Sequence, residues 1–343
     1  MRKTIKDVAD AAGVSTATVS RALAENPSSV AEETRLRVIA AADKLSYRTN
    51  HTARSLKVRS TMTVAVVFPE LANDFFMDVA EGIERELDAQ GYTMLLSSSR
   101  NSVEEEKKRI SMLADRMVDG MVIIPAGSRG EHLRVTAERV PMVLVDRIVE
   151  GPGFDAVVSD NEDGTRRLTQ ALLSDGFKRI AFVGGEITVS TARERLSGYA
   201  RALAEAGIQP EPSWICLGGM NVEDGYQRMK TLMEEPNPPE AMVAVNLLIH
   251  LGMERRLLDM DGPKPPVVIA GFDESRYTPF LPASRYTAFQ DAVAIGKRAG
   301  QRIIENIREK KTGRFEREHS GERIIRLPVT IHHHYTVGGK NGN

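Results

Sequence analysis

Apolar residues near the start of the chain recur at the spacing of two short helices joined by a tight turn. Residues 5–12 follow the i, i+3, i+4, i+7 pattern of a helix with one buried face, and Thr4 with Asp7 can cap its start. Gly13 can supply the positive φ that ends this helix, and Ser15 can cap a second one. This pattern predicts a helix-turn-helix unit.

A third apolar series, in residues 36–45, predicts a third helix that closes a small core. The segment that follows, residues 50–57, is too short and too polar to form a stable helix in isolation. We expect it to fold only when a partner offsets the entropy lost in ordering it. We therefore predict an all-α helix-turn-helix domain at 1–49, followed by a hinge helix and linker at 50–61.

From residue 62 the pattern changes to short apolar runs that alternate with longer amphipathic stretches. The apolar runs predict buried strands at 63–68, 93–96, 120–124, 142–145, 156–158, 180–183, 241–245 and 267–270. The amphipathic stretches predict helices at 77–90, 103–116, 165–173, 192–206, 225–233 and 295–307. Such alternation predicts parallel sheets covered on both faces. The predicted fold class is therefore an α/β core like that of periplasmic binding proteins, with two parallel-sheet subdomains.

The predicted core spans residues 62–343. It is divided into two subdomains at the points where the chain is expected to cross from one sheet to the other. The first subdomain is predicted to comprise residues 62–158 and 291–320. The second is predicted to comprise residues 159–290 and 321–343. A cleft between the two subdomains is the expected place for a ligand.

Charge changes this picture at the N-terminal end. The whole chain carries a formal net charge of −1, but residues 1–60 hold 11 Lys and Arg against 6 Asp and Glu. A positive end on a nearly neutral chain favours an anionic polymer as its partner. A basic end that is merely solvated remains the alternative on charge alone.

The second predicted helix presents a surface that fits the major groove of DNA. Val19 and Leu23 would face inward, while Thr16, Ala17 and Arg21 would lie on or near the opposite surface. Arg21 could make a bidentate contact to guanine, and Thr16 and Ala17 could contact thymine methyls or base edges. An amphipathic helical hairpin without a DNA role is the alternative interpretation.

Several spaced motifs together point to a known family. They are Thr4-Ile5-Lys6-Asp7-Val8-Ala9, Ala12-Gly13-Val14-Ser15, Thr18-Val19-Ser20-Arg21 and Ala53-Arg54-Ser55-Leu56-Lys57. With these motifs the chain resembles the lactose-repressor (LacI/GalR) family of bacterial regulators. The resemblance implies that double-stranded operator DNA is contacted by Thr4, Ser15, Thr16, Ala17, Thr18, Ser20, Arg21, Asn50, Ala53, Arg54, Leu56 and Lys57. It also implies that the Ala-Arg-Ser-Leu segment is a hinge helix whose Leu56 wedges into the minor groove beside Ala53.

Polar residues follow several predicted strands at their carboxyl ends, where ligands bind in folds of this kind. Asp146, Asn246 and Asp273 each follow such a strand, and Arg195 lies near the start of a predicted helix. Two carboxylates, an amide and a guanidinium suit a hydroxyl-rich ligand. Because an Asp at a strand end also commonly caps a helix, each position taken alone has a structural alternative.

The family resemblance implies that the same four residues hold the effector. It adds Phe75 and Phe76 as aromatic residues of the cleft, and Gln290 near the linkers between the subdomains. Two walls of the cleft depart from the family's pattern. Residues 247–249 are Leu-Leu-Ile where many members carry an aspartate and small residues, and Asn221 stands where some members carry an aromatic residue.

Several kinds of site find no support in the sequence. Cys216 is the single cysteine, which rules out an internal disulfide or a zinc site built from cysteines. His332, His333 and His334 suggest a metal site, but neighbours in an extended segment point to opposite faces, so we expect none. No hydrolase or dinucleotide motif is present, and we expect no cofactor. No apolar stretch has the length of a signal core or a membrane span, so a cytoplasmic protein is expected.

We therefore predict a homodimeric transcription repressor, not an enzyme, that binds a palindromic operator. Its predicted effector is a sugar, a sugar acid or a nucleoside, bound in the core cleft and coupled to the hinge. Three alternatives remain at this point. They are a global catabolite regulator with a phosphocarrier protein as co-effector, a sugar-binding protein without a DNA role, and a sugar-processing enzyme that uses Asp146 with Asp273 as an acid/base pair.

Overall fold

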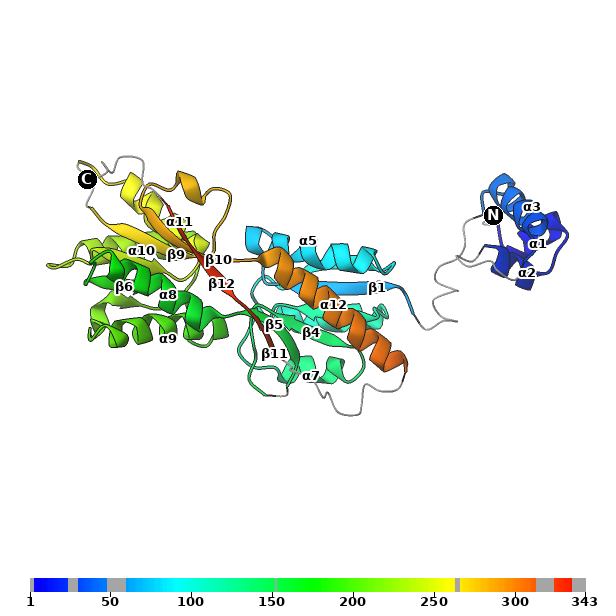
Figure 1. Cartoon of the computed structure of the whole chain (residues 1–343). Coiled ribbons are helices and arrows are strands. Elements are labelled where there is room, and N and C mark those ends of the chain that lie inside the picture. Colours follow the sequence, from blue (N-terminus) through cyan, green and yellow to red (C-terminus); the bar gives the residue numbers. More distant parts are fainter. Residues whose placement is uncertain are drawn as a thin grey trace. The chain divides into compact units, whose positions relative to one another are not determined.

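The computed structural model describes residues 3–23, 30–47, 60–151, 153–262, 266–312 and 324–334. The chain forms two compact units, Met1–Thr61 and Met62–Asn343 (Figure 1). Each unit has its own hydrophobic core. The predicted hinge residues Asn50, Ala53, Arg54, Leu56 and Lys57 lie outside the described residues.

In its described residues, the first unit packs three helices around a small aliphatic core. The helices are α1 (Ile5–Ala12), α2 (Thr16–Ala22) and α3 (Glu32–Lys44). Val8, Val19 and Val38, one from each helix, are completely buried and meet at the centre of this core. The apolar spacing seen in the sequence therefore corresponds to one continuous buried surface.

The second unit contains two six-stranded sheets, of which the first is entirely parallel. Its strand order is β11-β5-β4-β3-β1-β2. The strands are β1 (Thr63–Phe68), β2 (Thr93–Ser98), β3 (Gly120–Ile123), β4 (Met142–Val145), β5 (Asp155–Ser159) and β11 (Ile324–Leu327).

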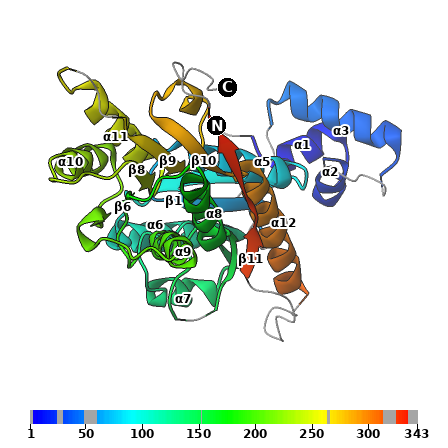
Figure 2. The same cartoon turned by 60° about the vertical axis from the view of Figure 1, so that its left-hand side comes forward.

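Helices cover both faces of this sheet. On one face lie α5 (Asp74–Asp88) and α12 (Ala292–Lys311), which run side by side in Figures 1 and 2. On the other face lie α6 (Val103–Asp115) and α7 (Glu131–Ala137). The two helices of the first pair approach closely at glycines: a Cβ on Gly82 would lie 2.2 Å from the carbonyl oxygen of Val293.

The second sheet has the strand order β12-β10-β9-β8-β6-β7 and is parallel except for β12. Its strands are β6 (Ile180–Val183), β7 (Ile215–Cys216), β8 (Ala241–Ala244), β9 (Val268–Phe272), β10 (Ser284–Gln290) and β12 (Val329–His333). Two short 3₁₀ turns, Pro212–Trp214 and Thr278–Phe280, precede β7 and β10.

Two pairs of helices enclose the second sheet. They are α8 (Asn161–Ser174) with α9 (Ser190–Glu205), and α10 (Val222–Met233) with α11 (Leu247–Leu258). Phe272 of β9 meets Gly164 of α8, while the adjacent Gly271 meets His250 of α11. Because neighbouring strand residues point to opposite faces, the two helix pairs cover opposite sides of the sheet.

Two expectations from the sequence are corrected here. Residues 321–343 do not belong wholly to the second subdomain, because β11 pairs with β5 of the first sheet and the chain crosses at Pro328 to β12 of the second (Figure 1). The strand at 93–96 is not buried, because β2 is an edge strand and Leu96 is 45% exposed. In addition, helices α7 and α11 and strands β7, β10, β11 and β12 were not predicted.

Candidate functional site

The turn between α1 and α2 is built as the sequence suggested. The hydroxyl of Thr4 accepts a hydrogen bond from the backbone of Asp7, whose carboxylate in turn accepts one from the Thr4 backbone at 2.7 Å. These bonds from Thr4 lower the pKa of Asp7. Gly13 ends α1 with φ 66°, and the Ser15 hydroxyl caps α2 by accepting from the backbone of Thr18 at 3.1 Å.

The predicted DNA-contacting residues of α2 lie on its outer side. Thr16, Ala17, Ser20 and Arg21 are exposed, as are Thr4 and Ser15 at the helix starts, and Thr18 is half-buried. The Arg21 side chain lies along its own helix, where Nε donates to the carbonyl of Ala17 at 3.3 Å. The outer face of α2 therefore carries short polar side chains and a cation near its C-terminal end. Such side chains can hydrogen-bond to the base edges exposed in the major groove of DNA.

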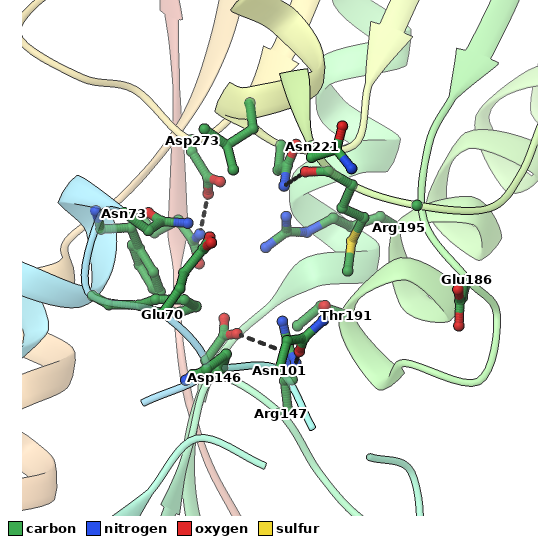
Figure 3. Close-up of a pocket in the computed structure, with 18 of the residues that line it drawn as sticks. Glu70, Asn73, Asn101, Asp146, Arg147, Glu186, Thr191, Arg195, Asn221 and Asp273 are labelled. Atoms are coloured by element: carbon green, nitrogen blue, oxygen red, sulfur yellow. Dashed lines mark hydrogen bonds and ion pairs between the residues drawn. The ribbon is translucent and has the colours of Figure 1, made fainter. Parts of the chain in front are cut away.

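The second unit contains a cavity of about 330 Å³, in the range of small-molecule sites. Its walls come from both subdomains (Figure 3). All seven residues predicted for the effector line this one cavity: Phe75, Phe76, Asp146, Arg195, Asn246, Asp273 and Gln290. They come from segments more than 200 residues apart along the chain, so the two sheets bring together what the sequence separates.

Both aspartates enter the cavity from a left-handed backbone directly after a strand. Asp146 follows β4 with φ 65°, and Asp273 follows β9 with φ 71°. This conformation is costly for a residue other than glycine and is retained mainly where the surroundings impose it. The amide of Gln290 donates to Oδ1 of Asp273, and the backbone of Leu247 approaches its Oδ2 at 3.5 Å.

Arg195 is the best-anchored cation of the cavity. Its Nε donates to Oδ1 of Asn161 at 2.8 Å, and Nη1 donates to the carbonyl of Val245 at 2.7 Å. Its guanidinium also lies 3.6 Å from the centre of the Phe272 ring, a cation–π contact. Burial lowers the pKa of Arg195, although Asp273 and Asp146 counteract the effect.

Asp146 sits beside a second buried cation. Burial raises the pKa of Asp146 to about 6, and the nearby Arg147 and Arg195 only partly oppose this. Arg147 approaches Oδ2 of Asp146 with its Nε at 3.7 Å, which is too long for a hydrogen bond. Nη1 of Arg147 donates to Asn101 and to the carbonyl of Pro125. The cavity therefore holds a carboxyl that gains a proton near pH 6.

Other lining residues were missed from the sequence. Glu70, Asn73, Asn101, Arg147 and Thr191 all contribute to the walls. Glu70 lies two residues beyond the end of β1, as Arg147 lies two residues beyond the end of β4, so the strand-end argument could have found both. Asn73, Asn101 and Thr191 lie on loops or helix starts, for which the sequence carries no comparable signal. Asn221 and Leu248, where the chain departs from the family's pattern, also line the cavity.

The histidines at the end of β12 and directly after it take part in a separate cluster at the second sheet. Nδ1 of His332 lies 2.7 Å from Oε2 of Glu274, and Nε2 of His334 lies 2.7 Å from the hydroxyl of Thr287. His333, between them, packs against the ring of Tyr286. Within the described ranges, no group of three or more metal-binding side chains is arranged to hold an ion. Over the same ranges, no helix has the length and apolar character to span a bilayer.

Comparison with protein families decides what kind of chain this is. Residues 61–320 match the model described as periplasmic binding proteins and sugar binding domain of LacI family. Residues 4–50 match the model described as bacterial regulatory proteins, lacI family. The chain belongs to the LacI family. The resemblance stated from the sequence motifs and the predicted fold class are both confirmed.

Individual LacI-family proteins match over nearly the whole chain. The HTH-type transcriptional repressor PurR of Pasteurella multocida (strain Pm70) is 31% identical over 95% of this chain and 98% of its own. The Lac repressor dimer bound to operator and the anti-inducer ONPF has a TM-score of 0.83 at 25% identity, covering 96% of this chain and 98% of the repressor. The transcriptional regulator CelR in complex with cellobiose has a TM-score of 0.69 at 27% identity, covering 98% and 100%.

Proposed function

We propose that this protein is a sequence-specific transcriptional repressor whose DNA binding is controlled by a small polar molecule of the sugar class. The observation that carries the proposal is the convergence of all seven predicted effector residues on one cavity. The capped helix-turn-helix with a polar, cationic outer face supports the DNA-binding half. The cellobiose complex of CelR supports a sugar as the effector class.

A homodimer is the proposed functional form. Two helix-turn-helix units would read the half-sites of a pseudo-palindromic operator, as a two-fold symmetric protein does. Paired hinge segments would insert Leu56 at a central base step and bend the DNA. Because a DNA-binding regulator acts where its operator DNA is, we also propose that the protein acts in the cytoplasm.

The protein is proposed to lack enzymatic activity. An acid–base role for Asp146 and Asp273 is not favoured, because similar proteins such as PurR are transcriptional repressors. Both aspartates line the cavity that is proposed to hold the effector. Asp273 is tied to Gln290 through Oδ1, which suits a fixed ligand contact better than proton transfer. Absence of turnover with any sugar that binds is the expected result.

The test is selection of operators from random duplex DNA with purified full-length protein, repeated with sugars, sugar acids and nucleosides. We expect a palindrome with a central pyrimidine–purine step whose enrichment changes with one class of compound. No enrichment under any condition would contradict the DNA-binding half. Enrichment that no compound alters, but that a phosphocarrier protein changes, would replace the small-molecule effector with a protein co-effector.

A further inference from the structure

Glu70 presents its carboxylate to the centre of the cavity (Figure 3). It follows β1 and is half-buried. No hydrogen bond or ion pair within the described part of the chain involves its side chain; the structure gives it only a longer-range attraction to Arg147. Figure 3 shows Glu70, Asp146 and Asp273 directed into the same space, which Arg195 enters from the other side.

The cations of the cavity are already engaged. Nε and Nη1 of Arg195 bind Asn161 and the Val245 carbonyl, and its face lies on Phe272. Arg147 binds Asn101 and the Pro125 carbonyl through Nη1, and its Nε faces Asp146. Protein groups therefore already hold part of each guanidinium, although Nε of Arg147 makes no hydrogen bond with the described residues.

The balance of charge in the lining is negative. Four carboxylates, those of Glu70, Asp146, Glu186 and Asp273, stand against the two guanidiniums. Asp146 is 7% exposed, and its carboxylate has no hydrogen bond among the described residues, so it also reaches the cavity unsatisfied. The raised pKa of Asp146 has the same cause, because burial of its charge is incompletely compensated. A ligand cation would supply the missing compensation, and a ligand anion would add to the repulsion.

We propose that Glu70 is the specificity-determining residue of this site and that the effector carries a protonated amino group, as an amino sugar does, which Glu70 binds. The proposal rests on the proposed function in that the cavity is taken to be an effector site. The hydroxyls of the same ligand would meet the carboxylates and amides of the opposite wall. The charged amine would then distinguish the true effector from the corresponding neutral sugar and sugar acid.

The experiment measures direct binding to the full-length protein by calorimetry for three matched series. Each series contains the neutral sugar, its 2-amino form and its uronic acid, in the glucose, galactose and mannose configurations. We expect one amino sugar to bind at least about tenfold more tightly than its neutral and acidic counterparts, which corresponds to about 1.4 kcal/mol. N-acetylation, which removes the charge, should abolish that advantage, and added salt should reduce it.

Three variants locate the effect. Glu70→Gln should reduce the preference for the amine to about threefold or less, whereas Glu70→Asp should keep part of it because the charge remains. Glu84→Gln makes the same substitution on the exposed side of α5 and should leave the preference unchanged. Tightest binding of a neutral sugar or an acid, no binding of any amine, or an unchanged preference in Glu70→Gln would overturn the proposal.

Failure of this inference can be distinguished from failure of the proposed function. An amine that binds through Glu70 but leaves operator binding unaltered would support this inference and count against control of the repressor by this cavity. A neutral sugar that releases operator from wild type and from Glu70→Gln alike would support control of the repressor by this cavity. It would also count against the role of Glu70 in recognising an amine.

Discussion

Oδ1 of Asn161 accepts a hydrogen bond from Nε of Arg195 at 2.8 Å, while Nδ2 of Asn161 donates to Glu194 at 3.2 Å. Glu194 receives both terminal nitrogens of Arg326, at 3.2 and 3.0 Å. Arg326 belongs to β11 of the first sheet, and the other three residues belong to helices of the second. A continuous polar path thus joins the cavity cation to the contact between the two subdomains.

Asn161→Ala should weaken effector binding by about tenfold, because the bond that orients Arg195 is lost and its buried Nε is left unpaired. The unpaired donor should also lower the free energy of unfolding by about 1–3 kcal/mol. Calorimetry with the identified effector and urea unfolding would measure both. Gln170→Ala, in the same helix, is the control, since the side chain of Gln170 donates to Glu205 at the surface. Equal effects in the two variants would contradict a positioning role for Asn161.

Glu194→Gln should change the coupling between effector binding and operator binding. It should change the affinity for effector alone, and the affinity for operator alone, by less. The ion pair with Arg326 is partly exposed and is worth less than about 1 kcal/mol in stability. It nevertheless joins the two subdomains that both line the effector cavity, and coupling energies in allosteric proteins are only about 1–3 kcal/mol. Titrating operator release with effector would measure the shift. An unchanged release midpoint would remove this contact from the coupling.

Asp146→Asn should stabilise the fold above pH 6 while abolishing tight effector binding. The folded-state pKa of Asp146 is about 6, against an ordinary value of 3.8, so the folded protein binds more protons than the unfolded chain between these values. Wild-type stability due to this group is therefore fully present below about pH 4 and is lost as the pH rises through 6. The variant should gain at most about 3 kcal/mol at pH 8 and nothing at pH 4. Urea unfolding at both pH values is the measurement, and an equal gain at both would refute this origin.

Arg21→Ala should weaken operator binding by about tenfold or more and relax the preference for one base of each half-site. A bidentate contact from arginine to guanine is worth about 1–3 kcal/mol. Fluorescence anisotropy with the selected operator and its single-base variants would measure both effects. Arg37→Ala removes an exposed arginine from α3 and is the comparison. A uniform loss across all sequences would assign Arg21 to phosphate contact instead.

Leu56→Ala should weaken operator binding without changing the thermal stability of the protein, because the proposed wedge acts only on DNA. A gel-shift titration and a thermal unfolding curve would measure the two properties. Operator affinity equal to that of wild type would dispose of the wedge.

Local signals sufficed for the helix-turn-helix and for most of the core elements. The caps predicted from Thr4, Gly13 and Ser15 are present, because each cap depends only on residues within a few positions in the chain. Buried strands such as β1 and β4 are apolar on both faces, so their composition alone marks them. The exposed edge strand β2 was misjudged as buried because an apolar run does not reveal which strands flank it.

The sequence by itself determined the family, the helical caps, the alternation of strands and helices, and which strand ends carry polar residues, since all of these depend on residues close together in the chain. Only the tertiary structure decided that Asp146, Arg195 and Asp273 share one cavity, and that Glu70 lines it as well. It also decided that β11 joins the first sheet and β12 the second. These relations depend on pairing between segments far apart in the chain and on burial by both subdomains, and neither has a local signature.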